Sequence, residues 1–499
     1  ALTVLGHSAF EAGRWADAER HYADVLSLGN AASTTLSTPE RRALEERLAA
    51  SIYRQGEAAR SAGRFPEAAG HFARVATAAP QSDVRVNAQY DAAAALLSAQ
   101  DWAAAVPVLE DFRSRYPGHP LQAELGPKLV LAYTELGRWA PAAQEVERLA
   151  QTAATPELAR NALWQAAELH EKAGNRPQAT AAWERYVQRH PLPLTAAVEA
   201  RAHLLALARQ AGQTSRELTL QREILQADQG GGEARSPRTR LLGAQAALAL
   251  VAPALASYRE VALVEPLQKQ LKVKKAKLEA VLQATALAAD YGVAEVVTAA
   301  TFQTAALYQD FGQALMRSER PKRLSKDELA QYDVLLEEQA FPFEEKAIAL
   351  HQVNAARAQQ GVYDRWVQQS FDALRTLRPA RYGKAERVET PATEAGTASL
   401  SQVDEALSAE PANAALHNRR GVLLRGLGRF GDARAAYEQA LTLKPDYADA
   451  ALNLGVLLDL YQGDKAGALT QFERYLALTP GGDAAVSKWV LELKNRKDA

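Results

Sequence analysis

The sequence predicts an all-α protein built from repeated pairs of helices. A pattern of small and aromatic residues recurs at the same spacing in separate parts of the chain. Pro411, Pro445 and Pro480 follow one another at intervals of 34 and 35 residues. Alanine-rich stretches with helical periodicity lie between these markers. Together, these observations are typical of helical hairpins stacked on one another.

The clearest copy of the pattern begins at Gly421 and ends at Pro445. The residues that follow Gly421 after 7, 12, 16 and 19 positions are Gly428, Ala433, Tyr437 and Ala440. Small residues let two antiparallel helices approach closely, an aromatic ring fills the space between layers, and a proline ends the second helix. The same spacings recur in two N-terminal sets, which are Gly56, Gly63, Ala68, Phe72, Val75 and Pro80, and Gly6, Gly13, Ala18, Tyr22 and Val25.

This pattern resembles that of the tetratricopeptide repeat (TPR) family, whose unit is a 34-residue helix-turn-helix. Weaker copies are Ala105, Leu109, Phe112 and Pro117, then Gly137, Ala142, Val146 and Leu149, then Gly174, Ala179, Trp183, Tyr186 and Pro191. After Gly212, Glu217 and Gln221 replace the expected small and aromatic residues. That repeat is therefore either degenerate or the end of the array.

The repeat frame and its interruption predict the organisation of the chain. The fold class is an all-α TPR helix-turn-helix solenoid with a non-TPR helical middle domain and a C-terminal TPR pair with a capping helix. Gly230 to Gly232 break the frame, and Ser236 with Pro237 is a typical helix start. The predicted regions are an N-terminal TPR array (1–229), a helical middle domain (230–390), a linker and partial repeat (391–411), a C-terminal TPR pair (412–482), and a capping helix and tail (483–499). The C-terminal pair carries one extra residue between Gly455 and Ala468.

The middle domain is expected to be helical although it lacks the frame. Ser325 and Glu328 form a capping box, and further helices are expected over 238–263, 266–290, 293–317, 343–359 and 362–378. Leu241 to Tyr258 is free of charge over 18 residues, which reaches the length of a membrane-spanning helix. Because much of it is alanine and it contains Pro253, we expect a packed helix and no direct membrane span.

Three stretches of the middle domain carry a second resemblance. They are Asp290 to Glu295, residues 335–346 reading LLEEQAFPFEEK, and residues 362–367 reading VYDRWV. They look like the helical core of bacterial envelope TPR proteins that accompany TolQ/TolR-type proton-channel motors, including those of gliding-motility complexes. The resemblance implies a periplasmic or envelope location within a large assembly. The chain starts at Ala1 rather than Met, which is compatible with removal of a signal or anchor segment.

Composition excludes several classes of function. The formal charge is −1 and there is no cysteine, so neither nucleic-acid binding nor thiolate, disulfide or cysteine-based metal chemistry is expected. The nine histidines form no i, i+4 pair, and the phosphate loop, G-x-S-x-G and H-E-x-x-H motifs are missing. We therefore expect no catalytic residues, no metal and no cofactor. The open alternative is an enzyme housed in the middle domain that uses Glu337, Glu345 or Asp364.

A stack of helical hairpins offers a concave groove lined by the first helix of each unit. Aromatic rings can anchor a partner there, and side-chain amides can bind its backbone. An equally open alternative is that the rings pack between layers. The expected groove residues are Tyr53, Glu57, Arg60, Asn87, Tyr90, Asp91, Trp164, Gln165, Glu168, Asn418, Arg425, Asn453 and Asp459.

The sequence therefore predicts a non-enzymatic scaffold that binds extended peptides or helices of other proteins in a cell-envelope assembly. The alternative within the same class is a cytoplasmic TPR adaptor or co-chaperone. Some TPR modules grip a C-terminal carboxylate through two asparagines and several basic residues. Here Asn453 matches one amide but Val422 stands at the place of the other, which argues against that mode.

Overall fold

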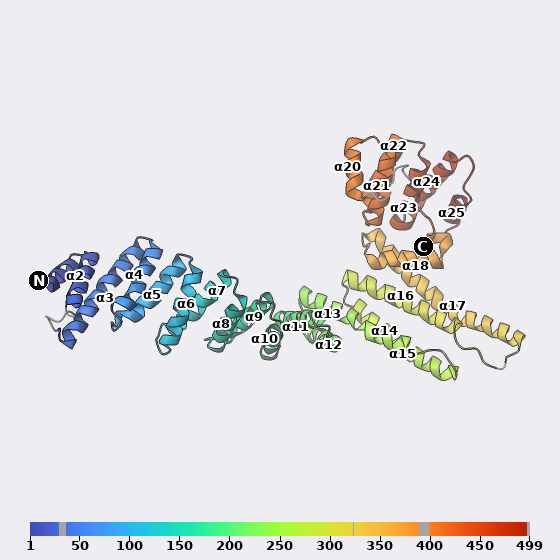
Figure 1. Ribbon diagram of the computed structural model, residues 1–499. Helices are drawn as coiled ribbons and strands as arrows, with labels where there is room; N and C mark the ends of the chain where they lie inside the picture. Colours follow the sequence, from blue (N-terminus) through green and yellow to red (C-terminus); the bar gives the residue numbers. More distant parts are fainter. Residues whose placement is uncertain (29–35, 323, 389–398, 497–499) are drawn as a thin grey trace. The chain divides into compact units, whose positions relative to one another are not determined.

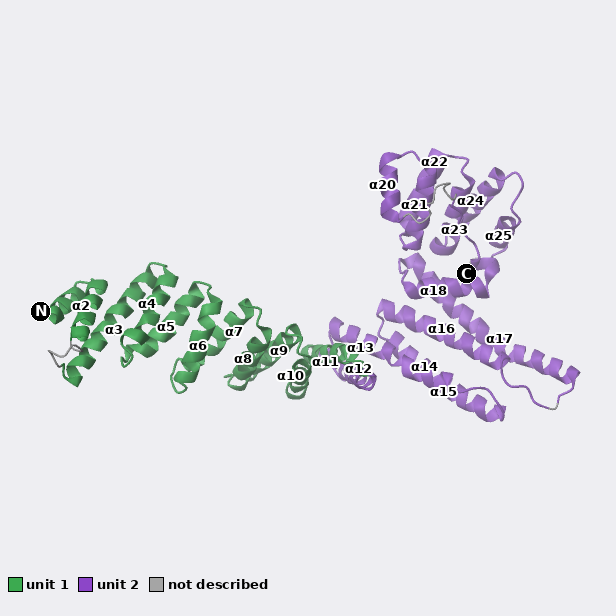
Figure 2. Cartoon of the chain, viewed as in Figure 1, with its two compact units in different colours: residues 1–213 green, residues 214–499 purple. Residues whose placement is uncertain are grey.

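The computed structural model describes residues 1–28, 36–322, 324–388 and 399–496 (Figure 1). Over these residues every regular element is a helix, which confirms the predicted all-α fold. The chain divides into two compact units, residues 1–213 and 214–499 (Figure 2). The boundaries predicted after residues 229, 390, 411 and 482 stay predictions. Part of the expected linker, residues 391–398, lies outside the described residues.

Unit 1 is a row of helical hairpins in which each helix packs on the next along the chain. Its helices are α1 (Leu2–Glu11), α2 (Trp15–Leu28), α3 (Thr38–Ser61), α4 (Phe65–Ala78), α5 (Val84–Ser98), α6 (Trp102–Arg115), α7 (Gln122–Glu135), α8 (Trp139–Gln151), α9 (Pro156–Lys172), α10 (Arg176–Arg189) and α11 (Leu194–Gln210).

Unit 2 holds long helices followed by two further hairpins and a last helix. Its elements are α12 (Thr214–Gln229), η1 (Gly232–Ala234), α13 (Pro237–Ala249), α14 (Val251–Arg259), α15 (Leu267–Ala289), α16 (Ala294–Met316), α17 (Lys326–Ala356), η2 (Arg357–Gln360), α18 (Arg365–Leu377), α19 (Pro379–Tyr382), α20 (Leu400–Ala409), α21 (Ala414–Gly426), α22 (Phe430–Leu443), α23 (Ala448–Leu457), η3 (Leu458–Gln462), α24 (Lys465–Leu478) and α25 (Ala484–Asn495).

The turns inside the hairpins fall where the repeat frame places its second glycine. Gly63 between α3 and α4 has φ 73°, and Gly428 between α21 and α22 has φ 75°. Glycine adopts this left-handed conformation without steric cost. In the α5–α6 hairpin, Gln100 occupies the same conformation with φ 59°. The α5–α6 turn therefore keeps the backbone conformation of the repeat although glutamine replaces the turn glycine.

The two helices of a hairpin touch where the frame pairs a glycine with a ring. A Cβ atom added to Gly56 in α3 would lie 2.6 Å from the ring of Phe72 in α4, and Phe72 is fully buried. Gly421 meets the ring of Tyr437 in the same way in the α21–α22 hairpin. The missing side chain is thus what lets the ring seat between the helices.

We predict that Gly56→Ala lowers the stability of unit 1. The new methyl group must displace the Phe72 ring, and overpacking of this kind costs about 1–3 kcal/mol. The matched control is Gly70→Ala in α4, because a Cβ atom there would meet nothing within 4 Å. That substitution should raise stability by about 0.5–1 kcal/mol. Thermal melting of both variants checks this, and an equal response to the two changes would contradict it.

The helices expected over 266–290, 293–317 and 362–378 correspond to α15, α16 and α18. The single helix expected over 238–263 is wrong, because this stretch forms two helices, α13 and α14, and the second ends at Arg259. The capping box forms as predicted, with the Glu328 amide donating to Ser325 Oγ over 3.3 Å. The separate helix expected from residue 343 is wrong, because α17 runs without interruption through Pro342. Proline removes one backbone hydrogen bond. Packing of α17 along α16, with Phe311 and Phe343 rings 4.6 Å apart, compensates for that loss.

The uncharged stretch forms α13 and α14. Residues Pro237–Arg259 are long and apolar enough to cross a membrane, and 33% of the most apolar window is buried. Both helices pack on α15, and Val251 and Tyr258 are buried. Core helices that never meet a membrane share this length and composition. The stretch therefore packs on α15, but as two helices that are only partly buried.

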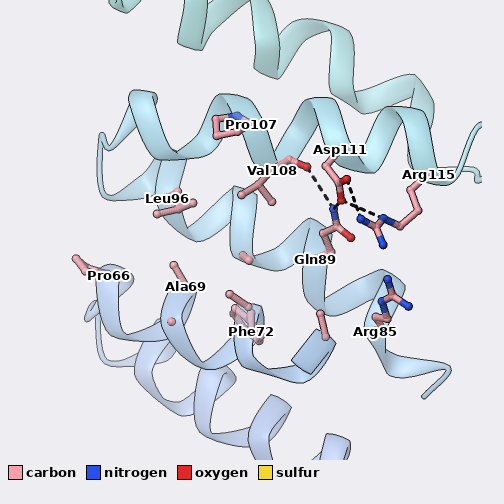
Figure 3. Close-up of a pocket in the computed structure, with 14 residues that line it drawn as sticks. Pro66, Ala69, Phe72, Arg85, Gln89, Leu96, Pro107, Val108, Asp111 and Arg115 are labelled. Atoms are coloured by element: carbon pink, nitrogen blue, oxygen red, sulfur yellow. Dashed lines mark hydrogen bonds and ion pairs between the residues drawn. The ribbon is translucent and has the colours of Figure 1, made fainter. Parts of the chain in front are cut away.

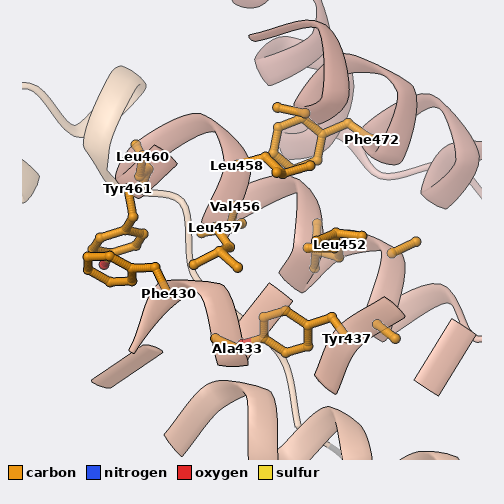
Figure 4. Close-up of a cluster of buried hydrophobic side chains, with 14 of the residues drawn as sticks. Phe430, Ala433, Tyr437, Leu452, Val456, Leu457, Leu458, Leu460, Tyr461 and Phe472 are labelled. Carbon is orange, nitrogen blue, oxygen red and sulfur yellow. The ribbon is translucent and has the colours of Figure 1, made fainter. Parts of the chain in front are cut away.

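The C-terminal hairpins share one hydrophobic core with α17 and α18. Phe430 from α22 and Tyr461 from η3 lie side by side in that core, with ring centroids 5.2 Å apart (Figure 4). Residues Leu458–Gln462 form a π-helical turn at the end of α23. The extra residue that the sequence shows between Gly455 and Ala468 is accommodated here. A π turn holds one residue more than an α turn, and such turns are frequent at functional sites.

Candidate functional site

Two asparagines face each other in the groove of the C-terminal hairpins. Asn418 comes from α21 and Asn453 from α23, and both are completely buried. Asn453 Nδ2 donates to Asn418 Oδ1 over 2.9 Å. Buried amides need further partners, and here those partners come from the chain's own residues 383–388, which form no helix between α19 and the start of the undescribed stretch.

The asparagine pair binds the backbone of this segment. The Arg387 amide donates to Asn453 Oδ1 over 2.7 Å, and Asn453 Nδ2 donates back to the Arg387 carbonyl over 2.6 Å. Asn418 Nδ2 lies 3.4 Å from the same carbonyl. One amide side chain therefore satisfies both backbone groups of one residue, as a neighbouring strand would.

The residue before Arg387 is held by charge. Arg425 Nε donates to Glu386 Oε2 over 2.8 Å, and Tyr437 OH donates to Glu386 Oε1 over 2.7 Å. The Glu386 side chain is only 3% exposed. Burial, with Glu386 beside it, raises the pKa of Tyr437, so the phenol stays a donor. Arg425 thus pairs with a residue of the same chain, and its role toward a partner protein stays a prediction.

The buried carboxylate of Asp459, in the π turn, forms ion pairs with three basic side chains. Asp459 accepts from Arg381 over 2.6 Å, from Arg496 over 2.7 Å, and from Lys384 Nζ. Lys384 and Asp459 side chains have no exposed surface, and Lys384 also contacts Glu492 over 2.9 Å. Burial opposes ionisation of Asp459, but the cations outweigh it and lower the pKa of this carboxyl. Asp459 is therefore ionised at neutral pH.

The side chain of Arg387 completes the contacts of the segment. Its guanidinium donates to Asp483 Oδ2 over 2.7 Å and to the Tyr475 hydroxyl. Asp483 also begins α25 as its N-cap. The helix predicted to cap the solenoid thereby contributes to the groove.

The four C-terminal groove residues predicted from sequence, Asn418, Arg425, Asn453 and Asp459, thus all contact the 383–388 segment. Sequence reasoning missed the segment itself, which lies at the end of the predicted middle domain (230–390), beyond the last helix expected there (362–378). Its only signal is the alternation of charge in Lys384, Glu386 and Arg387, which is equally typical of a solvated loop.

We predict that Asp459→Asn destabilises unit 2 by about 3 kcal/mol at pH 7, since it leaves buried cations without their anion. The pKa of Asp459 is lower in the folded chain than its unfolded value of about 3.9. Its contribution is therefore fully present above that pH and is lost as pH falls through the folded pKa.

The stability difference between the wild type and Asp459→Asn should accordingly shrink below about pH 4. Denaturation by urea at several pH values measures it. Asp432→Asn is the control, because Asp432 forms an exposed pair with Arg429 and should change stability little. An Asp459→Asn variant as stable as the wild type at pH 7 would contradict the account.

In unit 1, three predicted groove residues form one network between α3 and α5. Tyr53 OH donates to Asp91 Oδ2, and Arg60 Nη1 donates to Asp91 Oδ1 over 3.0 Å. Burial and the neighbouring Asp91 raise the pKa of Tyr53. These side chains join successive layers while remaining partly exposed. Their role toward a partner stays a prediction.

Two more of the predicted residues line a cavity beside this network. The cavity measures about 420 Å³ and is bounded by Tyr53 and Glu57 of α3 and Asn87 of α5. Asn87 is exposed. The cavity therefore offers a ring, a carboxylate and an amide on one face, which is the combination expected for holding a peptide.

Tyr90 and Trp164 also contact neighbouring helices. Tyr90 OH donates to Glu124 of α7, and Lys128 Nζ lies 5.3 Å above the Tyr90 ring. Trp164 packs edge-on against Trp183, with centroids 4.7 Å apart. Both rings remain partly exposed, so packing and anchoring are compatible.

The remaining predicted residues of this group are polar. Trp164 Nε1 donates to Glu168 Oε1 over 2.8 Å, and Glu168 and Gln165 are exposed on α9. They lie on the same helix as the ring and are accessible to a partner.

A larger apolar cavity lies among α4, α5 and α6. It measures about 600 Å³ and is lined by Phe72, Leu96 and Val108 among others (Figure 3). At its edge Asp111 accepts from Gln89 over 2.7 Å and from Arg115 over 2.9 Å. None of the groove residues predicted from sequence lines it.

The carboxylates named for the enzyme alternative have other roles or stand exposed. Asp364 caps α18 by accepting from the Trp366 amide over 2.9 Å. Glu345 pairs with Arg378 over 2.7 Å at the surface, and Glu337 is exposed. Within the described residues, no group of three or more metal-ligating side chains could hold a metal ion.

Comparison with known families and proteins agrees with the hairpin architecture. Tetratricopeptide-repeat models match residues 3–83 and 418–483, and another matches residues 161–192. A model of an outer membrane lipoprotein family matches residues 45–126. The Hsp70-Hsp90 organizing protein of Triticum aestivum is 37% identical over 79 residues, which are 16% of this chain and 13% of that protein.

Solved structures of low similarity were also found. A chain from the complex of Naa15 and Naa10 bound to HypK-THB is 14% identical, with a TM-score of 0.31, over 99% of this chain and 65% of that one. The P58(IPK) TPR domain is 12% identical, with a TM-score of 0.17, over 89% of this chain and 97% of that one. At these scores the likeness carries no information on partners.

Proposed function

The chain carries tetratricopeptide repeats, and from this premise we propose that it is a non-enzymatic scaffold that holds other proteins in its grooves. Repeats of this kind indicate a protein–protein interaction scaffold. The finer proposal is that the bound parts are extended peptides or helices, recognised by the groove residues named above. Neither nucleic acid nor a cofactor takes part in this proposal.

One observation carries the proposal: the C-terminal groove holds an extended backbone. Asn453 binds the amide and carbonyl of Arg387 over 2.7 and 2.6 Å. Backbone recognition by side-chain amides, combined with charged pockets for alternate side chains, is how peptide-binding grooves combine affinity with specificity. The described chain thus contains a groove with the chemistry that a peptide scaffold needs.

We further propose that the scaffold belongs to a cell-envelope assembly, such as a trans-envelope motor or gliding-motility complex. The match of residues 45–126 to an outer membrane lipoprotein family and the resemblance of the middle domain to envelope TPR proteins support this location. The alternative is a cytoplasmic adaptor or co-chaperone. The match of 79 residues to an Hsp70-Hsp90 organizing protein favours that alternative.

Cell fractionation, with sequencing of the precursor's N-terminus, separates the two locations. The envelope proposal expects a signal or anchor segment on the precursor and recovery of the protein with the envelope fraction. Recovery of an unprocessed protein in the cytoplasm would reject the envelope proposal and leave the adaptor.

We predict that Tyr90→Ala and Trp164→Ala each weaken capture of the partners that cross-link to the chain in cells. Loss of an anchoring ring costs about 2 kcal/mol of binding free energy, or roughly 30-fold in affinity. Tyr90→Phe is the matched control, since it keeps the ring and removes only the hydroxyl that donates to Glu124.

Capture is quantified by cross-linking and mass spectrometry, with helix content followed by circular dichroism. If either ring only packs between layers, its loss should lower stability by about 3–5 kcal/mol and leave capture by the folded variant unaltered. Unaltered capture would remove the anchor role of that ring.

A further inference from the structure

The occupied C-terminal groove contains three charge-selective positions in a row. Lys384 meets Asp459 and Glu492, the latter over 2.9 Å. Glu386 is bound by Arg425 over 2.8 Å. The first position therefore favours a basic side chain, and the second, two residues later, favours an acidic one.

The third position takes the residue that follows the anion. The Arg387 guanidinium contacts Asp483 over 2.7 Å and the Tyr475 hydroxyl. Between the selected residues, Ala385 is exposed, so its identity is free. The groove consequently recognises the pattern Lys-x-Glu-Arg in an extended backbone.

The pattern is read in one backbone register. The asparagine pair binds the backbone of Arg387 and of no other residue in the segment. A shift by one residue in one direction would bring Glu386 to the acidic side chain of Asp483, and a shift in the other direction would bring Arg387 to Arg425, so like charges oppose both neighbouring registers. Specificity is therefore set by side chains and affinity by the backbone contacts.

We propose that this groove is a binding site for an extended Lys-x-Glu-Arg segment of a partner protein, and that residues 383–388 occupy it in cis until such a segment displaces them. This inference rests on the proposed scaffold function and names the ligand of one of its grooves. A partner segment can replace residues 383–388 because the contacts of Glu386 and Arg387 are hydrogen bonds and ion pairs. An incoming segment of the same chemistry can restore each of them.

The outer end of the cis segment is the less enclosed one. The Arg387 side chain is 49% exposed, and Val388 is 38% exposed. Lys384, at the other end, is fully enclosed. Displacement is therefore expected to begin at Arg387 and proceed toward Lys384.

The test uses the full chain and a fluorescent peptide with the sequence of residues 383–388, Gly-Lys-Ala-Glu-Arg-Val. The variant Lys384→Ala/Glu386→Ala/Arg387→Ala removes the cis side chains and changes none of the groove residues that contact them. Fluorescence anisotropy should show at least tenfold tighter peptide binding by this variant than by the wild type. Ala385→Ser, the matched control, should behave like the wild type.

A peptide in which the glutamate is replaced by arginine should bind the triple variant at least tenfold more weakly, because it would face Arg425. Equal peptide binding by wild type and triple variant, or no binding by a triple variant of unchanged helix content, would overturn the proposal. If the triple variant loses helix content, Arg387→Ala decides by the same comparison, since its side chain is half exposed.

The outcome is separable from that of the scaffold proposal. Failure of the peptide to bind, with normal capture of partners by the N-terminal grooves, rejects only the cis-occupied site. Loss of all capture with normal peptide binding rejects the scaffold proposal, and with it the partner protein, and leaves only the selectivity of the groove for the Lys-x-Glu-Arg peptide.

Discussion

The architecture depends on how closely two antiparallel helices can approach. In each clear hairpin a glycine on the first helix faces a buried ring on the second, and an added Cβ atom would overlap that ring, as at Gly56 and Phe72. This contact fixes the separation of the helices and, with the turn glycine seven residues later, their register. Stacked layers then bring their first helices to one face. The grooves are a consequence of that packing.

A departure from the frame creates the chemistry of the C-terminal groove. The single extra residue after Gly455 is taken up by the π turn Leu458–Gln462, and that turn carries Asp459. Its carboxylate is completely enclosed and meets Lys384, Arg381 and Arg496. Charge buried to this degree is costly unless it is paired. Through Asp459, the same ion pairs connect Lys384 of the 383–388 segment and Arg496 after α25 to the C-terminal hairpins.

The fold was largely predictable because its determinants are local in sequence. The spacing of Gly421, Gly428 and Tyr437 follows from contacts within one hairpin, so it is visible in the sequence. The continuity of α17 through Pro342 was not predictable, because it depends on packing along the preceding helix α16, and no repeat frame in this region indicates that contact. The frame likewise shows which side chains face the groove.

The occupant of the C-terminal groove could not be predicted in the same way. Asn418, Arg425, Asn453 and Asp459 were expected to line the groove because of their positions relative to the repeat frame. Glu386 and Arg387 lie outside the frame, and their contacts reach residues 31 to 96 positions away. A short charged segment has no period that would indicate such contacts. Only the folded chain shows that Asn418 and Asn453 act together on its backbone.

The central claim is that a groove amide holds an extended backbone, and the most direct measurement is hydrogen exchange of the Arg387 amide. The amide donates to Asn453 Oδ1 over 2.7 Å, so the account predicts slow exchange in the wild type. It also predicts exchange accelerated by at least tenfold in Asn453→Ala, with helix protection unchanged elsewhere. Fast exchange in the wild type, or equal rates in the two proteins, would contradict the account.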